Sequence, residues 1–292
     1  MPALRVDVAF GVRAQLGEGP VWDERTQTLW WVDIDRHLLW CQTPGASGPR
    51  CADIGEEVAA VLPREEEGLV LSLRTAVALT DRQLTITSLV PVLSARAGKM
   101  RLNDAACDPA GRLWFGSMAT DGQLGRGALY TLAPDHSLSC ARASVSVSNG
   151  LGWSPDGRTM YYVDTPTQRI DAFAFDVDSG RLGRQRTLAT VPVSDGKPDG
   201  LAVDGDGSIW VALWGGGAVQ QLSPLGRWGH RIELPTSNVT SCCFGGANLQ
   251  ELYITTARRG LASAKLATEP LAGAVFVCSP GTHGLPVTRF VG

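Results

Sequence analysis

The chain has 292 residues, of which 44% are hydrophobic, enough to fill the core of one large β-type domain or of two ordinary domains. The formal net charge of −3 argues against nucleic acid or an anionic membrane as a partner. No apolar run reaches the length of a membrane span, and Arg5 and Asp7 interrupt the stretch where a signal peptide would need an apolar core. We therefore expect a cytoplasmic protein, either a monomer or a weak homodimer.

A turn followed by an aromatic-rich strand recurs along the chain. The copies are 26–33 (TQTLWWVD), 66–73 (EEGLVLSL), 110–117 (AGRLWFGS), 156–164 (DGRTMYYVD), 206–213 (DGSIWVAL) and 248–256 (NLQELYITT), of which 66–73 is the weakest. One marker residue in each copy gives spacings of 40, 44, 47, 49 and 43, the markers being Trp30, Val70, Trp114, Tyr161, Trp210 and Tyr253. The repeat unit is therefore 40 to 49 residues long.

Each marker is followed by a second segment in which apolar and polar residues alternate. These segments are 37–43, 76–81, 127–132, 169–176, 217–223 and 273–278. A period of two, bounded by Gly and Asp turns, indicates strands rather than helices. Several strands in each unit of a repeat in the forties are typical of a β-propeller, and the alternative is a β-sandwich with accidental spacing. We predict an all-β fold, a six-bladed β-propeller with a central metal-binding channel, formed by residues 1–292 as a single domain.

The seven cysteines are not arranged as a disulfide framework. Their number is odd, no CxxC occurs, and most of them have apolar neighbours. This pattern favours reduced cysteines that serve as small core hydrophobic residues.

Four polar residues stand at nearly the same distance before their markers. Glu18 and Asn149 precede theirs by 12 residues, and Asn103 and Asp199 by 11. Each is followed by Gly or Asp and then by a small or apolar run; the same place in the remaining units falls on Thr240 and Ser241 and around Val58. The innermost strand of every propeller blade lines the central channel, so equivalent positions in different blades face one another. The sequence therefore predicts that these four side chains converge.

The converging set consists of oxygen donors, two of them carboxylates. Buried carboxylates without a basic partner must either bind a cation or take up protons. Carboxylate and amide oxygens suit one hard divalent ion, so we expect Ca²⁺, with Mg²⁺, Mn²⁺ or Fe²⁺ as alternatives; Zn²⁺ accepts such a set but more often takes nitrogen or sulfur. The competing interpretation is that these residues only form turns, because Asn-Gly and Asp-Gly are common turn dipeptides.

The segments LGEGPVWD, RLNDAACDPAGRLWFGSM, SNGLGWSPDGRTMYYVD, PDGLAVDGDGSIWVA and TSCCFGG resemble, nearly end to end and in order, the SMP-30/gluconolactonase family, which includes regucalcin and bacterial sugar lactonases. The resemblance implies a six-bladed propeller with a divalent metal in its channel. It implies that Glu18, Asn149 and Asp199 are metal ligands and that Asp199 is also the general base of lactone hydrolysis. It further implies that Arg101 and Asn103 contact the substrate.

Three residues form the expected substrate site. Arg101 and Asn103 are two positions apart, so on a strand they face the same side, and Arg101 can donate to sugar hydroxyls. Asp121 lies close to the position of a substrate-contacting Glu in animal members of the family, although the loop 119–127 is shorter here. This Gly-rich loop forms either a cover over the site or a plain surface connection.

These residues predict a hydrolase that opens a sugar lactone, its small-molecule partner, to the aldonic acid. The ion would polarise the lactone carbonyl and Asp199 would take a proton from water, unless the ion itself provides the base and Asp199 only orients the water. The alternatives are an organophosphate or aryl-ester hydrolase on the same scaffold and a non-catalytic Ca²⁺-binding protein. Arg101 favours a polyhydroxylated substrate over an apolar one.

Overall fold

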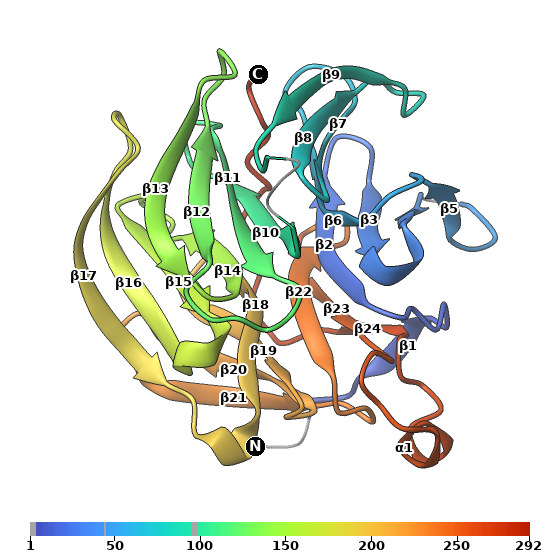
Figure 1. The fold of residues 1–292 in the computed structure, drawn as a ribbon. Helices are drawn as coiled ribbons and strands as arrows, with labels where there is room; N and C mark the ends of the chain where they lie inside the picture. Colours follow the sequence, from blue (N-terminus) through green and yellow to red (C-terminus); the bar gives the residue numbers. More distant parts are fainter. Residues whose placement is uncertain (1–3, 44, 95–97) are drawn as a thin grey trace.

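The computed structural model describes residues 4–43, 45–94 and 98–292. Its strands form six four-stranded antiparallel sheets arranged as blades around a central axis (Figure 1). The predicted six-bladed β-propeller is therefore confirmed, and each of the six markers lies on the second strand of its blade. Among the described residues, no helix is both long and apolar enough to cross a membrane.

Five blades each consist of four strands that are consecutive in the sequence. They are β2 (Gly17–Asp23), β3 (Thr28–Asp33), β4 (Leu38–Gln42) and β5 (Arg50–Asp53); β6 (Val58–Pro63), β7 (Leu69–Leu73), β8 (Ala76–Thr80) and β9 (Ile86–Pro91); β10 (Met100–Cys107), β11 (Leu113–Ala119), β12 (Gly127–Leu132) and β13 (Leu138–Val145); β14 (Ser148–Trp153), β15 (Thr159–Asp164), β16 (Arg169–Asp176) and β17 (Arg181–Thr190); and β18 (Lys197–Val203), β19 (Ile209–Trp214), β20 (Ala218–Leu222) and β21 (Trp228–Glu233).

The sixth blade joins the two ends of the chain. It contains β22 (Val239–Gly245), β23 (Glu251–Thr256) and β24 (Val275–Cys278), and its outer strand is β1 (Asp7–Phe10). Because β1 pairs with β24, separating the first blade from the last requires breaking a sheet. The ring is thus closed by backbone hydrogen bonds rather than by packing alone.

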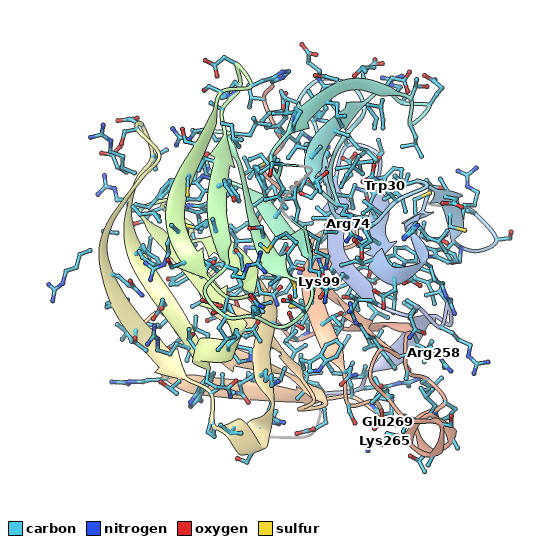
Figure 2. All side chains as sticks on the ribbon, viewed as in Figure 1. Trp30, Arg74, Lys99, Arg258, Lys265 and Glu269 are labelled. Atoms are coloured by element: carbon cyan, nitrogen blue, oxygen red, sulfur yellow. The ribbon has the colours of Figure 1, made fainter. Side chains whose placement is uncertain are left out.

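The helical segments are short and lie in connections between strands. They are η1 (Ile34–Arg36), η2 (Thr165–Thr167), η3 (Val193–Asp195) and α1 (Ser263–Thr268). Figure 2 shows Lys265 and Glu269 together at α1, where Lys265 Nζ lies 2.9 Å from Glu269 Oε1. Glu269 also accepts a 2.9 Å hydrogen bond from the Ser237 backbone, which holds this connection against the start of β22.

The repeated turn before the second strand has a physical cause in two blades. Asp108 and Asp204 are buried, and each accepts hydrogen bonds from the backbone of its own turn. The second carboxylate oxygen of each accepts a 2.9 Å bond from an indole N–H, that of Trp114 and Trp210 respectively. One aspartate therefore fixes both the turn and a buried tryptophan, which explains the recurring six-residue spacing between them.

The cysteine prediction is only partly correct. All seven are free. Cys107, Cys242 and Cys278 are buried, but Cys51 and Cys140 are exposed, so these two are not core residues. Both exposed cysteines lie on outer strands of their blades, β5 and β13, where one face of the sheet meets solvent.

Residues 283–292, here called the C-terminal strap, run across one end of the channel. They hydrogen-bond five of the six blades through the residue pairs His283–Gly205, Gly284–Leu249, Val287–Glu24, Phe290–Pro63, Phe290–Glu65 and Val291–Gly111. Arg289 also donates to the Asp23 carboxylate. Phe290 is fully buried in the main apolar cluster. The strap therefore seals this end of the ring.

Phe290→Ala is expected to lower the free energy of unfolding by about 3 to 5 kcal/mol, because it leaves a cavity in the main apolar cluster. Chemical denaturation followed by tryptophan fluorescence measures the change. Val291→Ala is the matched control: the neighbouring side chain is 49% exposed and should change stability by no more than about 0.5 kcal/mol. Equal losses in the two variants would contradict a sealing role for Phe290.

Candidate metal centre

All six innermost strands are irregular at the predicted polar position. Their pairing with the second strand shifts register there, in β2 between Glu18 and Val21, in β6 between Val58 and Ala60, in β10 between Leu102 and Ala105, in β14 between Asn149 and Leu151, in β18 between Pro198 and Leu201, and in β22 between Val239 and Ser241. A bulge redirects side chains and increases the local twist. The repeated bulge therefore turns this ring of residues toward the channel axis.

Glycine follows three of the predicted residues because neighbouring blades approach closely. A Cβ added to Gly150 would lie 2.6 Å from the Asp199 carbonyl oxygen, and one added to Gly200 would lie 2.2 Å from Ser241 Oγ. Gly19 has a φ of +51°, which a residue with a side chain adopts at a cost. The glycines thus allow the inner strands to crowd around the axis.

Asp199 is a buried carboxyl group, and Glu18 is a half-buried one. Burial raises the pKa of Glu18 to about 8, and the nearby Asp104 charge adds to the effect. Burial also raises the pKa of Asp199 well above its ordinary value, with further contributions from the charges of Glu18 and Asp104. The Arg101 charge lowers both pKa values without cancelling these effects. Without a cation, the site therefore favours the protonated, neutral forms of these carboxyl groups.

Arg101 stands beside these carboxyl groups: it is only 5% exposed and close enough to affect both pKa values. Arg101 Nη1 donates 2.8 Å to the Leu102 carbonyl and 2.6 Å to Asn103 Oδ1. The side chains of Arg101 and Asn103 thus lie on the same side of β10, as their spacing predicts. Burial lowers the pKa of Arg101.

A chain of hydrogen bonds runs from Arg101 to Asp199. Asn103 Nδ2 donates 2.7 Å to the Ser148 carbonyl and 3.1 Å to Asn149 Oδ1. Asn149 Nδ2 in turn donates to Asp199 Oδ1 and, over 3.0 Å, to Thr165 Oγ1. Residues from β10, β14 and β18 are thereby joined into one network. Asn103, Asn149 and Asp199 are all buried.

The unused oxygen lone pairs fit a cation. Glu18 Oε2 accepts from the Gly19 backbone over 3.1 Å, but within the described residues nothing donates to Oε1. Asp199 Oδ2 likewise has no protein donor there, and Asn149 Oδ1 uses one of its two lone pairs. Three residues from three blades therefore offer free oxygen acceptors, and two of them are carboxyl groups that can ionise when a cation binds. Such a donor set matches a hard divalent ion.

The equivalent residues of the other inner strands add no ligand to the predicted three. In the described part of the chain, no three His, Cys, Asp or Glu side chains are grouped closely enough to hold a metal ion, so the amide of Asn149 is needed to complete the set. Thr240 is buried and donates 2.6 Å to the Gly17 carbonyl. Val58 is apolar and fully buried. Neither side chain offers a free oxygen to the centre.

The sequence interpretation missed Asp104. Burial raises its pKa to about 6, and its charge acts on both Glu18 and Asp199. A signal was present: Asp104 occupies the position that glycine holds after Glu18, Asn149 and Asp199. It adds a third carboxyl group to the charge balance of the site.

Asp121 lies apart from this network, in the exposed connection between β11 and β12. Its carboxylate accepts a 3.2 Å hydrogen bond from the Gln123 backbone and lies 3.9 Å from Arg126 Nη1. Thr120 N, next to it, donates to the Lys99 carbonyl just before β10 begins, so this loop stands at the Arg101 end of the channel.

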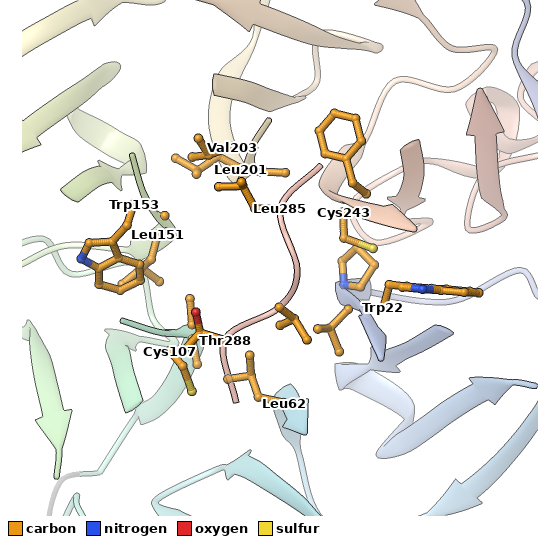
Figure 3. Close-up of a pocket in the computed structure, with 18 of the residues that line it drawn as sticks. Trp22, Leu62, Cys107, Leu151, Trp153, Leu201, Val203, Cys243, Leu285 and Thr288 are labelled. Carbon is orange, nitrogen blue, oxygen red and sulfur yellow. The ribbon is translucent and has the colours of Figure 1, made fainter. Parts of the chain in front are cut away.

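The other half of the channel is an apolar cavity of about 390 Å³. Figure 3 shows Trp22, Leu62, Cys107, Leu151, Trp153, Leu201, Val203 and Cys243 around the strap segment that carries Leu285 and Thr288. Among the described residues that line it, Asp104 is the one that carries a charge, and it stands between the two halves. The channel is therefore polar at the Glu18 end and apolar beneath the C-terminal strap.

Divalent ions are expected to bind more tightly as the pH rises from about 6 to about 8. Because the pKa of Glu18 is about 8, this carboxyl group holds a proton at neutral pH, and only the carboxylate binds a cation. Binding of the ion at pH 7 should therefore release about one proton or more, and binding above pH 9 should release fewer. Calorimetry in two buffers of different ionisation enthalpy counts the released protons. Binding without proton release would contradict the protonated state of the site.

Comparisons with known proteins agree with the fold and show the family. A family model described as SMP-30/Gluconolactonase/LRE-like region matches residues 16–258. Regucalcin of Gallus gallus is 35% identical over 301 residues, which covers 100% of both chains. The calcium-binding protein regucalcin from Agrobacterium tumefaciens strain C58 superimposes with a TM-score of 0.92 at 25% identity, covering 99% of both chains. A gluconolactonase from Xanthomonas campestris gives a TM-score of 0.74 at 26% identity, covering 94% of this chain and 89% of its own.

Proposed function

The chain belongs to the SMP-30/gluconolactonase/LRE-like family, and on this basis we propose that it is a metal-dependent lactonase that hydrolyses a sugar lactone to the aldonic acid. One divalent ion is held by Glu18, Asn149 and Asp199, with Ca²⁺ favoured by the all-oxygen donor set. Arg101, Asn103 and Asp121 contact the substrate. The proposal extends the family assignment to a substrate class, a cofactor and named residues.

One observation carries this proposal: free oxygen acceptors of three residues converge where burial raises the pKa values of two carboxyl groups. The charge of Glu18 raises the pKa of Asp199 across two blades, and the Asn149 amide, which donates to Asp199, keeps an acceptor lone pair free. This arrangement is expected of a cation-binding site rather than of three separate turns.

The protein's own groups can carry out the proton transfers. When bound, the ion supplies a Lewis acid that polarises the lactone carbonyl and stabilises the charge developing on its oxygen. Asp199 accepts a proton from water as the water oxygen attacks the carbonyl carbon. The bond from that carbon to the ring oxygen then breaks, and the ring oxygen takes up the proton. The raised pKa of Asp199 strengthens it as a base, although an adjacent cation lowers that pKa again.

The buried network holds the reacting groups before substrate arrives. Arg101 is fixed by two hydrogen bonds from Nη1 and has further N–H groups free for substrate hydroxyls. Asn103 has both hydrogens of its amide bound, and its Oδ1 accepts from Arg101 with one lone pair left. Asn103 therefore orients Arg101 and Asn149 and can still accept from a substrate hydroxyl. Such preorganisation lowers the entropy cost of reaching the reactive geometry.

A panel of aldonolactones tests the proposal. Metal-stripped protein and protein reconstituted with Ca²⁺, Zn²⁺, Mn²⁺ or Mg²⁺ are each given gluconolactone, gulonolactone, galactonolactone, arabinonolactone and xylonolactone, and acid release is followed with a pH indicator. Hydrolysis faster than the spontaneous opening of each lactone is expected only with reconstituted protein. Absence of turnover with every ion and lactone overturns the proposal.

The relatives named regucalcin favour a second candidate, a calcium-binding protein without catalysis. It uses the same three ligands and differs only in the absence of turnover. Tight Ca²⁺ binding by calorimetry, combined with no rate on the lactone panel, would support this candidate over the lactonase.

Arg101→Ala is expected to reduce kcat/KM for sugar lactones at least about 10-fold more than for an apolar ester such as phenyl acetate. A hydrogen bond from a charged donor is worth about 1.5 to 3 kcal/mol, and an apolar ester has no hydroxyl to receive it. Both substrates are measured at saturating metal, so that loss of the Arg101–Asn103 contact does not confound the comparison. An equal fall for both substrates would mean that Arg101 is structural.

A further inference from the structure

We infer that Thr165 is a positioning residue that sets the orientation of the Asn149 amide and fixes the two ligand-bearing strands, β14 and β18, relative to each other. This inference rests on the proposed metal centre. Thr165 is not on an inner strand. It begins η2, the connection between β15 and β16, and was not among the predicted site residues.

The hydroxyl group of Thr165 has only one possible arrangement of its hydrogen bonds. Thr165 Oγ1 lies 2.9 Å from the Pro198 carbonyl oxygen, and a carbonyl can only accept. The single hydroxyl hydrogen therefore points to Pro198. The oxygen can then only accept at its other contact, the 3.0 Å bond from Asn149 Nδ2. The side-chain amide of Asn149 must therefore turn its nitrogen, and not its oxygen, toward Thr165.

The opposite end of the network imposes the same orientation independently. Arg101 can only donate, so Asn103 presents Oδ1 to it, and the Ser148 carbonyl can only accept, so Asn103 presents Nδ2 there. The same Nδ2 contacts Asn149, which must then present Oδ1. With both ends fixed, Asn149 keeps one Oδ1 lone pair for a cation.

Thr165 also joins two blades at their ligands. Asn149 belongs to β14, and Pro198 immediately precedes Asp199 on β18. One hydroxyl group therefore contacts the side chain of one proposed ligand and the backbone next to another. Its own position is set by the backbone bond from Thr165 N to the Val147 carbonyl, two residues before Asn149. Val has the shape of Thr but no hydroxyl group, so it could make neither contact.

Thr165→Val tests the inference with a readout that needs no catalysis. Metal-stripped protein is titrated with Ca²⁺ alone and with Mn²⁺ alone in a calorimeter. Loss of a side chain that orients a metal ligand typically costs 10- to 100-fold in affinity. We expect a loss of about that size for both ions, whereas Thr165→Ser, which keeps the hydroxyl, should stay within about threefold of the unaltered protein.

A matched control lies two residues away. Thr167 Oγ1 donates 2.7 Å to the Asp164 carbonyl within the same 3-10 helix, so Thr167→Val removes a hydroxyl there without touching the ligands. It should leave both affinities within about threefold. Circular dichroism verifies the fold of each variant, and Thr165→Ala replaces Thr165→Val if the latter does not fold.

The outcomes separate this inference from the proposed function. If the unaltered protein binds neither ion, the metal centre fails and the inference fails with it. If the unaltered protein binds and Thr165→Val binds equally well, the role of Thr165 is overturned while the metal centre stands. If Thr165→Ser loses as much affinity as Thr165→Val, the hydroxyl group is not what matters, and the inference is again overturned.

Discussion

Glu18→Gln is expected to weaken divalent-metal binding by at least about 100-fold and to lower the rate of lactone hydrolysis by at least about 1,000-fold. Loss of a hydrogen bond that orients a metal ligand already lowers metal affinity by up to about 100-fold, and loss of the charge of the ligand itself lowers it further. Lewis-acid stabilisation is worth several kcal/mol, and each 1.4 kcal/mol or so is tenfold in rate. Calorimetry and the lactone assay measure the two effects.

The fold should survive this change. Gln has nearly the shape of Glu and carries no charge that must be desolvated, so the metal-free variant should be at least as stable as the metal-free parent above pH 8, where Glu18 ionises. Glu67→Gln, at a side chain that is 67% exposed, is the matched control and should change neither binding nor rate. If Glu18→Gln keeps both the metal and the rate, Glu18 is only a turn residue.

Asp199→Asn should lower kcat by about 100- to 10,000-fold, the usual contribution of a general base, even when enough metal is added to saturate the variant. Asn retains an oxygen that can bind a cation, so metal affinity should fall less steeply than the rate. The pH–rate profile of any residual activity should lose its base-dependent limb. Steady-state kinetics at several metal concentrations separate the two effects.

Recovery of the rate at saturating metal would instead mean that Asp199 is a ligand and not the base. Asp195→Asn provides the control, because this carboxylate lies four residues earlier, in η3, and has no contact with the network around Asn149. It should leave both kcat and metal affinity unchanged.

The fold could be predicted because the interactions that define each repeat are made between residues close together in the sequence. The aromatic markers, the alternation of the following segments and the aspartate turns all act within one blade, so each leaves a pattern of fixed spacing. Ring closure by β1 and sealing by the C-terminal strap leave no such pattern, because Phe290 is one apolar residue whose partners are distant in the sequence. Their physical basis is contact between segments at opposite ends of the chain.

The site was predicted in part for the same reason. Glu18, Asn103, Asn149 and Asp199 share an offset in the repeat, so their convergence follows from propeller geometry alone. Thr165 stands outside that offset and acts through a connection between strands, and the bulges that aim the side chains inward have no sequence signature of their own. Asp104 was missed because it stands one position beyond that offset, where the other three units have glycine.

The most direct test of the central claim is anomalous diffraction from crystals of the protein loaded with Mn²⁺ or Zn²⁺. The account predicts one strong anomalous peak in the channel, between about 2.0 and 2.6 Å from an oxygen of each of Glu18, Asn149 and Asp199. A fully loaded crystal with no peak at these three residues, or with its peak elsewhere, would contradict it.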